Sequence, residues 1–296
     1  MKLKNIAAPY KITAGRKFRL DRIDPNDTGG YEQRKAAALL KLGVEQLAEM
    51  QAQLYAQNRW AVLLIFQAMD AAGKDSAIEH VMSGVNPQGC QVYSFKAPSH
   101  EELDHDFLWR CARSLPERGR VGIFNRSYYE EVLVARVHPE LLEKQHLPAR
   151  LVKRRIWADR YSDIANFESY LARNGVAICK FFLHLSKEEQ KRRFLERIDK
   201  PRKHWKFSIA DIHERSYWSE YMAAYEDMVR NTSATHAPWY VLPADHKWYT
   251  RLLISSAVVD SLSRLDLGFP EIDAGRRAEL EAARAALTSE KVNRRH

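Results

Sequence analysis

A continuous apolar run at residues 60–66, followed at once by a turn of small residues, constrains the fold more than any other segment. Such a run, without polar alternation, is typical of a strand buried on both faces of a parallel sheet. Four more segments have strand-like composition, at residues 91–95, 120–125, 176–185 and 239–243. Helical patterns separate these segments, which predicts an α/β protein with a central parallel sheet covered by helices on both faces.

The helices expected around this sheet begin with a long amphipathic one at residues 31–58, where leucines recur at helical spacing. Further helices are expected at residues 76–82, 101–115, 151–173, 187–197, 211–232 and 248–266. Residues 1–30 are broken by prolines and a turn cluster, so we expect an irregular arm on the surface. Residues 275–296 are rich in Ala, Arg and Glu and predict a surface helix or a frayed tail.

The charge of the chain favours an anionic partner. Its 296 residues include 47 Lys and Arg against 38 Asp and Glu, a net charge of +9. This excess alone does not distinguish nucleic acid, a membrane surface and polyphosphate. The longest apolar stretch is too short for a membrane span, and the first residues begin no signal peptide, so we expect a cytoplasmic protein. The three cysteines lie far apart, which speaks against a disulfide framework or a zinc site.

The turn after the first strand has the features of a phosphate-binding loop. Such a loop needs a strand, a tight turn, a helix whose free N–H groups point at the anion, and a lysine that neutralises the outer phosphates. Gly73 and Lys74 stand where that pattern requires them. Ala68 replaces the usual first glycine, and Asp75 replaces the usual Ser or Thr.

Asp70 is an unusual residue within this loop, because its carboxylate would repel phosphates unless a divalent cation lay between them. We therefore expect Asp70 to be a metal ligand. The alternative is that the Gly-Lys pair is incidental and that Asp70 merely caps the following helix.

A second group of candidates follows the strand at residues 120–125. Open α/β sheets bind ligands at the carboxyl ends of their strands, where Asn125 and Arg126 lie. The planar guanidinium of Arg126 suits contact with transferring phosphoryl oxygens. The alternative is that Asn125 forms a turn and Arg126 is a solvated charge. Glu130 and Glu131 begin the next expected helix.

Residues 191–206 contain eight Lys or Arg and two acidic residues. They lie between the fourth and fifth strands, where nucleotide kinases carry a mobile lid that lowers basic side chains onto phosphates. A solvated basic face is the alternative. We thus divide the chain into an N-terminal arm and long helix (1–58), a core with a lid at about 187–232 (59–270), and a C-terminal surface helix or tail (271–296).

Six segments, taken together, resemble the polyphosphate kinases of family 2. They are residues 67–75, 84–89, 123–134, 180–184, 205–207 and 237–241, within a span of roughly residues 21–267. The resemblance implies a three-layer αβα sandwich of the P-loop kinase type with a helical lid. It also implies transfer of a terminal phosphoryl group between inorganic polyphosphate and a nucleotide with Mg²⁺, which Mn²⁺ can replace, and a homodimer or homotetramer. The segment after residue 123 resembles the subgroup that phosphorylates both nucleoside monophosphates and diphosphates, such as AMP and ADP or GMP and GDP.

Carried over by position, this resemblance assigns catalytic roles to Asp70, Lys74 and Arg126, with Asp70 holding the metal. Glu130 would help to define the acceptor site. The expected nucleotide- and phosphate-binding residues are Ala71, Ala72, Gly73, Lys74, Asp75, Ser76, Asn125, Arg126, Glu130, Arg192, Arg193 and Lys206. Many family members have Asp at the position of Asn125, so the group that completes the metal shell is open. Direct in-line transfer needs no nucleophilic side chain, so we expect no phospho-enzyme.

Two rival functions fit part of the pattern. A nucleoside monophosphate kinase that uses ATP shares the phosphate loop and the lid but does not need the large basic excess. A nucleic-acid-binding protein with a degenerate loop fits the basic stretch, but the sequence carries no recognised nucleic-acid motif, so no nucleic-acid partner is expected. No membrane partner is expected either. No segment indicates a preference for adenine or guanine.

Overall fold

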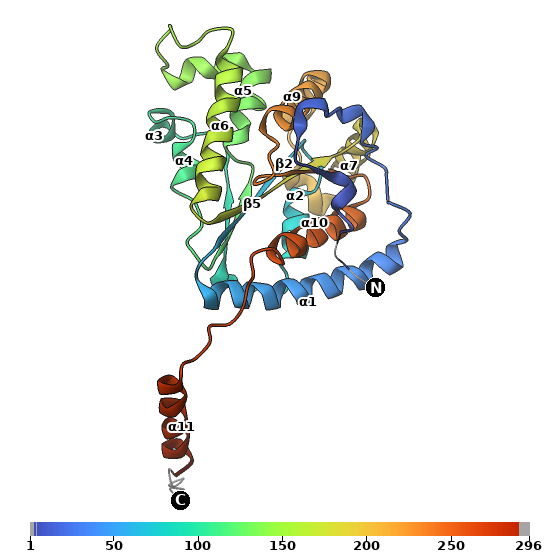
Figure 1. Ribbon diagram of the computed structural model, residues 1–296. Helices are drawn as coiled ribbons and strands as arrows, with labels where there is room; N and C mark the ends of the chain where they lie inside the picture. The colour runs from blue at the N-terminus through green and yellow to red at the C-terminus, as the bar shows by residue number, and fades with distance from the viewer. Residues whose placement is uncertain (1–2, 4, 290–296) are drawn as a thin grey trace, which may run out of the picture.

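The computed structural model describes residue 3 and residues 5–289, which fold around one six-stranded sheet of order β1-β6-β5-β2-β4-β3 (Figure 1). All five strands expected from the sequence are present and parallel. The strands are β1 (Lys11–Ile12), β2 (Ala61–Ala68), β3 (Cys90–Ser94), β4 (Val121–Asn125), β5 (Val176–His184) and β6 (Trp239–Pro243). Strand β1 was not expected, and it pairs antiparallel with β6 at one edge.

Helices cover both faces of the sheet, which confirms the three-layer αβα prediction. Because side chains alternate along a strand, Val62 and Leu64 of β2 join one core while Leu63 and Ile65 join the other. One layer contains α1 (Gln33–Gln57), α2 (Lys74–Val81) and α10 (Lys247–Leu262). The other contains α4 (Trp109–Ala112), α5 (Val134–Val137), α6 (Ile156–Arg173) and α9 (Trp218–Thr232).

Two helical segments are interrupted where the sequence predicts one helix each. The expected helix at residues 101–115 is divided into α3 (His100–Leu103) and α4, and Asp106, in the turn between them, accepts a hydrogen bond from the N–H of Leu108. The lid region contains α7 (Lys187–Asp199), the 3₁₀ helix η7 (Pro201–Lys206) and α8 (Ile209–Ser216), which is separated from α9 at Tyr217. Among the described residues, no helix is long and apolar enough to cross a membrane.

The described residues among the first thirty do more than lie on the surface, and that expectation is corrected. Leu3 and Tyr10 are buried in one core, and Phe18 is buried in the other. Gly15 lies so close to α9 that a Cβ atom there would be 2.3 Å from the carbonyl oxygen of Val229. The buried residues of this segment are irregularly spaced, so no periodicity in the sequence reveals that they are buried.

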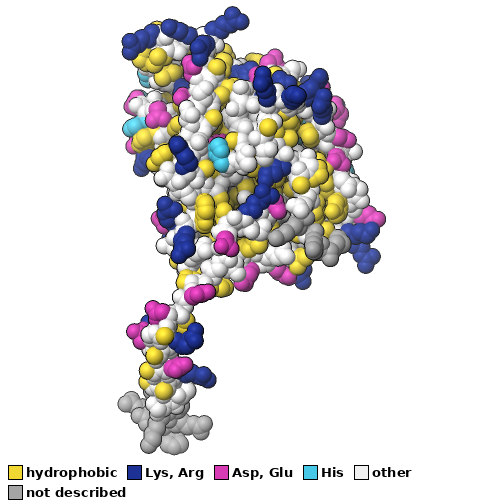
Figure 2. Space-filling model, viewed as in Figure 1, with side chains coloured by type: hydrophobic (Ala, Val, Ile, Leu, Met, Phe, Trp, Pro, Cys, Tyr) yellow, Lys and Arg dark blue, Asp and Glu magenta, His cyan; other side chains and the backbone are white. Residues whose placement is uncertain are grey.

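Helix α11 (Ala274–Ser289) stands clear of the rest of the protein (Figure 1). All of its residues are exposed, and apolar, basic and acidic side chains appear on the face seen in Figure 2. The expected helix at the end of the chain is therefore present, but it does not lie on the surface of the core. Residues 290–296 of the expected tail lie outside the described residues.

Candidate active site

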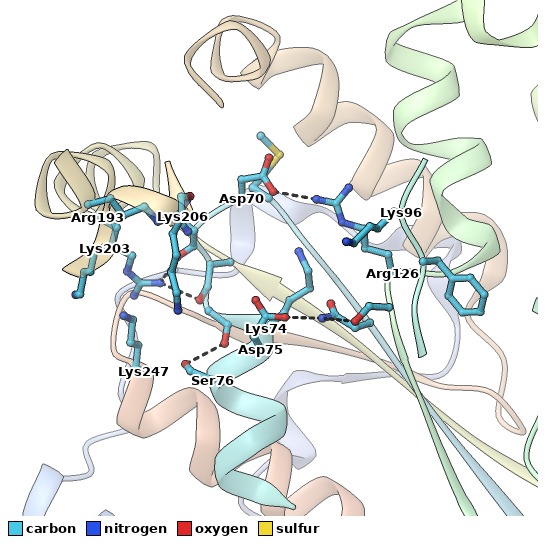
Figure 3. A pocket seen from close by; sticks show the side chains of 18 of the residues that line it. Asp70, Lys74, Asp75, Ser76, Lys96, Arg126, Arg193, Lys203, Lys206 and Lys247 are labelled. Atoms are coloured by element: carbon cyan, nitrogen blue, oxygen red, sulfur yellow. Dashed lines mark hydrogen bonds and ion pairs between the residues drawn. The ribbon is translucent and has the colours of Figure 1, made fainter. Parts of the chain in front are cut away.

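A pocket of about 510 Å³ opens at the carboxyl ends of β2, β3 and β4 (Figure 3). Its walls are formed by the loop between β2 and α2 with the start of α2, by the ends of β3 and β4, by the lid from α7 to η7, and by Lys247 at the start of α10. Strand β2 pairs with β4, so the loop and the residues after β4 are adjacent. This is the edge at which parallel sheets bind ligands. The structure thus brings together the two groups of residues singled out in the sequence.

The loop at residues 69–73 turns sharply because two of its residues have left-handed backbone conformations. Ala71 has φ +64° and Gly73 has φ +102°. Glycine adopts such a conformation readily, whereas alanine is strained in it. Helix α2 begins directly afterwards at Lys74, so its free N–H groups are close to the pocket. The strand, tight turn and helix N-terminus that a phosphate-binding loop needs are all present.

Lys74 is buried at the base of the pocket, with 9% of its surface exposed. Its Nζ atom donates a hydrogen bond to the carbonyl oxygen of Ala68 at 2.8 Å. Burial lowers the pKa of Lys74, and the charge of Arg126 lowers it further, while Asp70 and Glu130 oppose the shift. The side chain points into the pocket between the loop and the end of β4 (Figure 3).

Arg126 follows β4 with a left-handed backbone, at φ +65°. Its N–H group donates to the carbonyl oxygen of Phe66, which holds this conformation. Its guanidinium lies 3.1 Å from Asp70 and 3.5 Å from Glu130, measured from nitrogen to carboxylate oxygen. The charge of Glu130 raises the pKa of Arg126, whereas burial raises the pKa of Glu130 itself. Arg126 therefore lies between two carboxylates at the mouth of the pocket.

Two residues that differ from the types usual at their positions, Asp75 after the phosphate loop and Asn125 at the end of β4, contact each other. The Nδ2 atom of Asn125 donates a hydrogen bond to Asp75 at 2.5 Å and lies 3.5 Å from the hydroxyl of Ser94. An aspartate at position 125 would instead place a second carboxylate against Asp75. The amide at position 125 thus suits the carboxylate at position 75. Glu130 and Glu131, expected to begin a helix, lie in the 3₁₀ helix η5 (Tyr128–Val132).

The three basic lid residues singled out in the sequence have different surroundings. Lys206 lines the pocket. Arg192 forms a close ion pair with Glu189 on the exposed side of α7 and is not part of the pocket lining. Arg193 reaches the pocket wall but is 3% exposed, and it donates hydrogen bonds to loop carbonyl oxygens. One basic run in the sequence therefore contains a pocket residue, a surface residue and a buried residue.

Several pocket residues were not among the individual site residues expected from the sequence, although two of them, Arg197 and Lys203, lie in the basic run at residues 191–206 from which the lid was predicted. Lys96 follows β3, Lys247 follows β6 at the start of α10, and Lys203 and Arg197 belong to the lid. Lys96 and Lys247 lie just beyond the carboxyl ends of expected strands, so the rule that identified Asn125 would have identified them as well. Together with Lys74 and Lys206, these side chains give the pocket a strongly basic lining (Figure 3).

A second pocket of about 260 Å³ adjoins the first and shares Lys96, Ala97 and Arg126 with it. It has a more apolar lining, and Glu130 and Glu131 contribute carboxylates to it. Its apolar residues are Ala97, Pro98, Leu103, Val134, Ala135 and Leu141. A basic pocket next to an apolar one suits a ligand that has both phosphates and a flat organic group.

The donor atoms of the site fit a metal ion that is shared with a substrate. Among the described residues, no group of three or more His, Cys, Asp or Glu could hold a metal alone. Mg²⁺ is usually held by one or two carboxylates, with phosphate oxygens and waters as its other ligands. Asp70, on the loop, and Asp75, in the first turn of α2, both line the pocket and provide such carboxylates.

A family model described as polyphosphate kinase 2 matches residues 30–268, which is more than half of the chain. The chain belongs to the polyphosphate kinase 2 family. A protein from Rhodopseudomonas palustris named ADP-polyphosphate phosphotransferase is 51% identical over 289 residues, covering 97% of this chain and 99% of that protein. A protein from Meiothermus ruber named AMP/ADP-polyphosphate phosphotransferase is 44% identical, with coverage of 88% and 95%.

A solved structure gives the same result for the fold. The crystal structure of polyphosphate kinase 2 from Arthrobacter aurescens has a TM-score of 0.86 and 40% sequence identity, and the match covers 95% of this chain and 99% of that one. The family predicted from the motif series and the P-loop kinase-like α/β fold are both confirmed. The chain is a kinase of this family, whose phosphotransferases typically need a divalent metal ion.

Proposed function

We propose that the protein transfers a terminal phosphoryl group between inorganic polyphosphate and a nucleoside mono- or diphosphate, in either direction, with Mg²⁺. The observation that carries this proposal is the pairing of a strongly basic pocket with an adjoining apolar one. Polyphosphate is a chain of closely spaced negative charges, which the lysines of the first pocket can neutralise. The second pocket suits the nucleoside. The names of the two relatives above support AMP and ADP as acceptors.

The chemistry assigned to the side chains is positioning and charge neutralisation. Phosphoryl transfer asks little covalent chemistry of a protein, so no side chain needs to act as a nucleophile. Lys74 and the N–H groups at the start of α2 would bind the oxygens of the transferring phosphoryl group. Arg126, at the junction of the two pockets, would align donor and acceptor for in-line attack. When bound at Asp70, with Asp75 nearby in the first turn of α2, Mg²⁺ would neutralise phosphate oxygens.

The lid would close this arrangement. Lys203 and Lys206 are on η7, opposite the phosphate loop, where they can contact the outer part of a polyanion. Closure over the substrates would exclude water, which strengthens the electrostatic interactions and prevents hydrolysis. The family resemblance also supports a homodimer or homotetramer, and sedimentation equilibrium measures that state directly.

The test is a phosphotransfer assay without ATP. The protein is incubated with long-chain polyphosphate, Mg²⁺ and, separately, AMP, ADP, GMP or GDP, and the products are separated by ion-exchange chromatography. We expect the acceptor to gain one phosphoryl group at a time, with ATP formed from ADP. The Lys74→Ala variant is the control for contaminating kinases. If phosphate moves only from ATP to AMP and never from polyphosphate, the protein is a nucleoside monophosphate kinase and the proposal is wrong.

A further inference from the structure

Three successive carbonyl groups of the phosphate loop are held by side chains from helix α7. The Nε2 atom of Gln190 donates to the carbonyl oxygen of Asp70 at 3.0 Å. The Nη1 atom of Arg193 donates to those of Ala71 and Ala72, at 2.9 and 2.8 Å. Gln190 and Arg193 are 1% and 3% exposed and are three residues apart, so they share the buried face of α7. The back of the loop is thus bonded to the first helix of the lid.

Every N–H group of Arg193 is used in this way. A guanidinium has five N–H donors, and five hydrogen bonds to protein acceptors are present. Two go to the loop, and the others go to the carbonyl oxygens of Ala244 and Asp245 and to the carboxylate of Glu189. The three latter distances are 2.7, 3.0 and 2.7 Å. Arg193 therefore has no donor left for a phosphate, although it was expected to bind one.

These contacts explain how a strained loop keeps its shape. In a planar trans peptide the C=O and N–H groups point in opposite directions. When a loop carbonyl points at α7, the N–H group of the same peptide bond therefore points away from α7. In the peptide bond between Ala72 and Gly73, the carbonyl of Ala72 points at Arg193, so the N–H of Gly73 points away from it. Ala71 has a left-handed backbone, which an alanine keeps only where its surroundings impose it. Gln190 and Arg193 supply that constraint on both peptide groups next to Ala71.

The same support is connected to the rest of the lid. The Nη1 atom of Arg215, on α8, donates to the Oε1 atom of Gln190 at 2.9 Å and to the carbonyl oxygen of Lys187 at 2.7 Å. A continuous path of hydrogen bonds therefore runs from α8 through Gln190 to Asp70. The carboxylate of Glu189 anchors Arg193 from the same helix. A shift of α8 relative to α7 would therefore alter the support of the loop.

We propose that Gln190 and Arg193 are positioning residues that hold the phosphate loop in its anion-binding form, and that Arg215 couples this support to the lid. This inference rests on the proposed function, because it names what shapes the phosphate site of that reaction. In this proposal Arg193 does not make the direct contact with polyphosphate that the sequence had suggested, but affects phosphate binding by holding the loop backbone.

The first test separates the charge of Arg193 from its geometry. Lysine keeps the positive charge but cannot bond to five acceptors at once. We expect Arg193→Lys to weaken binding of inorganic tripolyphosphate, measured by calorimetry, roughly tenfold or more, with a similar fall in kcat. The control is Arg230→Lys, the same substitution at an arginine that donates to a backbone carbonyl oxygen, that of Phe18, and does not contact the loop. The control should bind tripolyphosphate within about twofold of the wild type.

The second test uses Gln190→Met, which removes the donor to the carbonyl oxygen of Asp70 and the acceptor for Arg215 without changing charge. We expect weaker tripolyphosphate binding and a lower kcat, with the salt dependence of binding unchanged, because no cation that faces the phosphates is lost. The melting temperature without ligand is measured for every variant. A variant that loses melting temperature but binds tripolyphosphate like the wild type shows a purely structural role and overturns the inference.

Two further outcomes are equally decisive. Wild-type binding and kcat in Arg193→Lys would show that a positive charge suffices, which overturns the positioning role. Because tripolyphosphate binding is measured without turnover, the inference and the proposed function can fail separately. A wild-type protein that binds tripolyphosphate but transfers nothing contradicts the proposed function alone, whereas normal transfer in all the variants contradicts this inference alone.

Discussion

Lys74, at the start of α2, and Lys180, on β5, are both buried lysines, yet their surroundings differ completely. Lys180, on β5, is 0% exposed and donates to the hydroxyl of Tyr129, the carboxylate of Glu168 and the carbonyl oxygen of Thr232, at 3.0, 2.5 and 2.7 Å. Lys74, just after β2, is 9% exposed, and its Nζ atom bonds to one acceptor among the described residues, Ala68.

The difference shows what marks a functional lysine in this fold. An ammonium has three donors. Lys180 uses all three within the protein, whereas Lys74 keeps donors that point into the pocket. Burial lowers the pKa of both lysines, so the direction of the shift does not distinguish them. The number of unused donors distinguishes them. By the same criterion Arg193, whose N–H groups are all used within the protein, resembles Lys180. The following variants test this comparison, in order of decreasing effect on activity.

Lys74→Ala should lower kcat roughly a thousandfold, because the loop backbone remains but the charge on the transferring phosphoryl group is lost. Steady-state kinetics with polyphosphate and ADP measures the fall, and circular dichroism checks the fold. Activity within about tenfold of the wild type would mean that Lys74, like Lys180, serves the structure.

Asp70→Asn should lower kcat roughly a hundredfold at low magnesium, with partial recovery as Mg²⁺ is added, because the amide is a weaker ligand than the carboxylate. A magnesium titration of kcat for both proteins gives the shift in metal affinity. If the two titrations superimpose, Asp70 acts only through its ion pair with Arg126 and some other group holds the metal.

Asn125→Asp should lower kcat roughly tenfold, because it places a second carboxylate against Asp75. The double variant Asp75→Ser with Asn125→Asp restores the more usual arrangement of these residue types and should recover most of the loss. The double-mutant cycle measures the coupling. Additive effects would show that the contact between the two side chains does not matter.

Replacing Lys203 and Lys206 together with alanine should raise the KM for polyphosphate several-fold and change the KM for the nucleotide less. The difference from the wild type should shrink at high salt, because the contacts are electrostatic and partly exposed. Kinetics at two salt concentrations decides between a lid that contacts the polyanion and a solvated face, for which both KM values stay unchanged.

Lys180→Met should have the smallest effect on activity, leaving kcat of the folded enzyme within about twofold of the wild type. The variant leaves Glu168 buried without its cation, which costs about 3–5 kcal/mol of the free energy of unfolding. Urea denaturation measures that loss. A large fall in kcat in a fully folded variant would show that Lys180, like Lys74, contributes to catalysis.

The main features of the sheet and the phosphate loop were predictable because they are local patterns. Continuous apolar runs identify the buried strands, and the Gly-Lys pair after one of them identifies the loop. The antiparallel strand β1 could not be predicted, because its two residues are too few to show the alternating pattern of a strand. The role of Lys180 could not be predicted either, because one lysine inside an apolar run does not reveal its partners on α6 and α9.

The lid was only partly predictable for a geometric reason. Successive residues on a helix are rotated by about 100°, so Arg192 and Arg193 point in different directions although they look equivalent in the sequence. Arg192 pairs with Glu189 on the exposed side, while Arg193 reaches five buried or part-buried acceptors. Those acceptors are mostly backbone carbonyl groups from distant loops, which no side-chain pattern encodes.

The path of hydrogen bonds from α8 through Gln190 to the loop has a consequence for how the two substrates are bound. If polyphosphate on the lid lysines orders α8, it changes the free energy of any anion bound at the loop. Thermodynamic linkage makes this effect reciprocal: the factor by which polyphosphate tightens the nucleotide equals the factor by which the nucleotide tightens polyphosphate. Cooperation between the substrates would then arise in the protein behind the loop, without any contact between the substrates themselves.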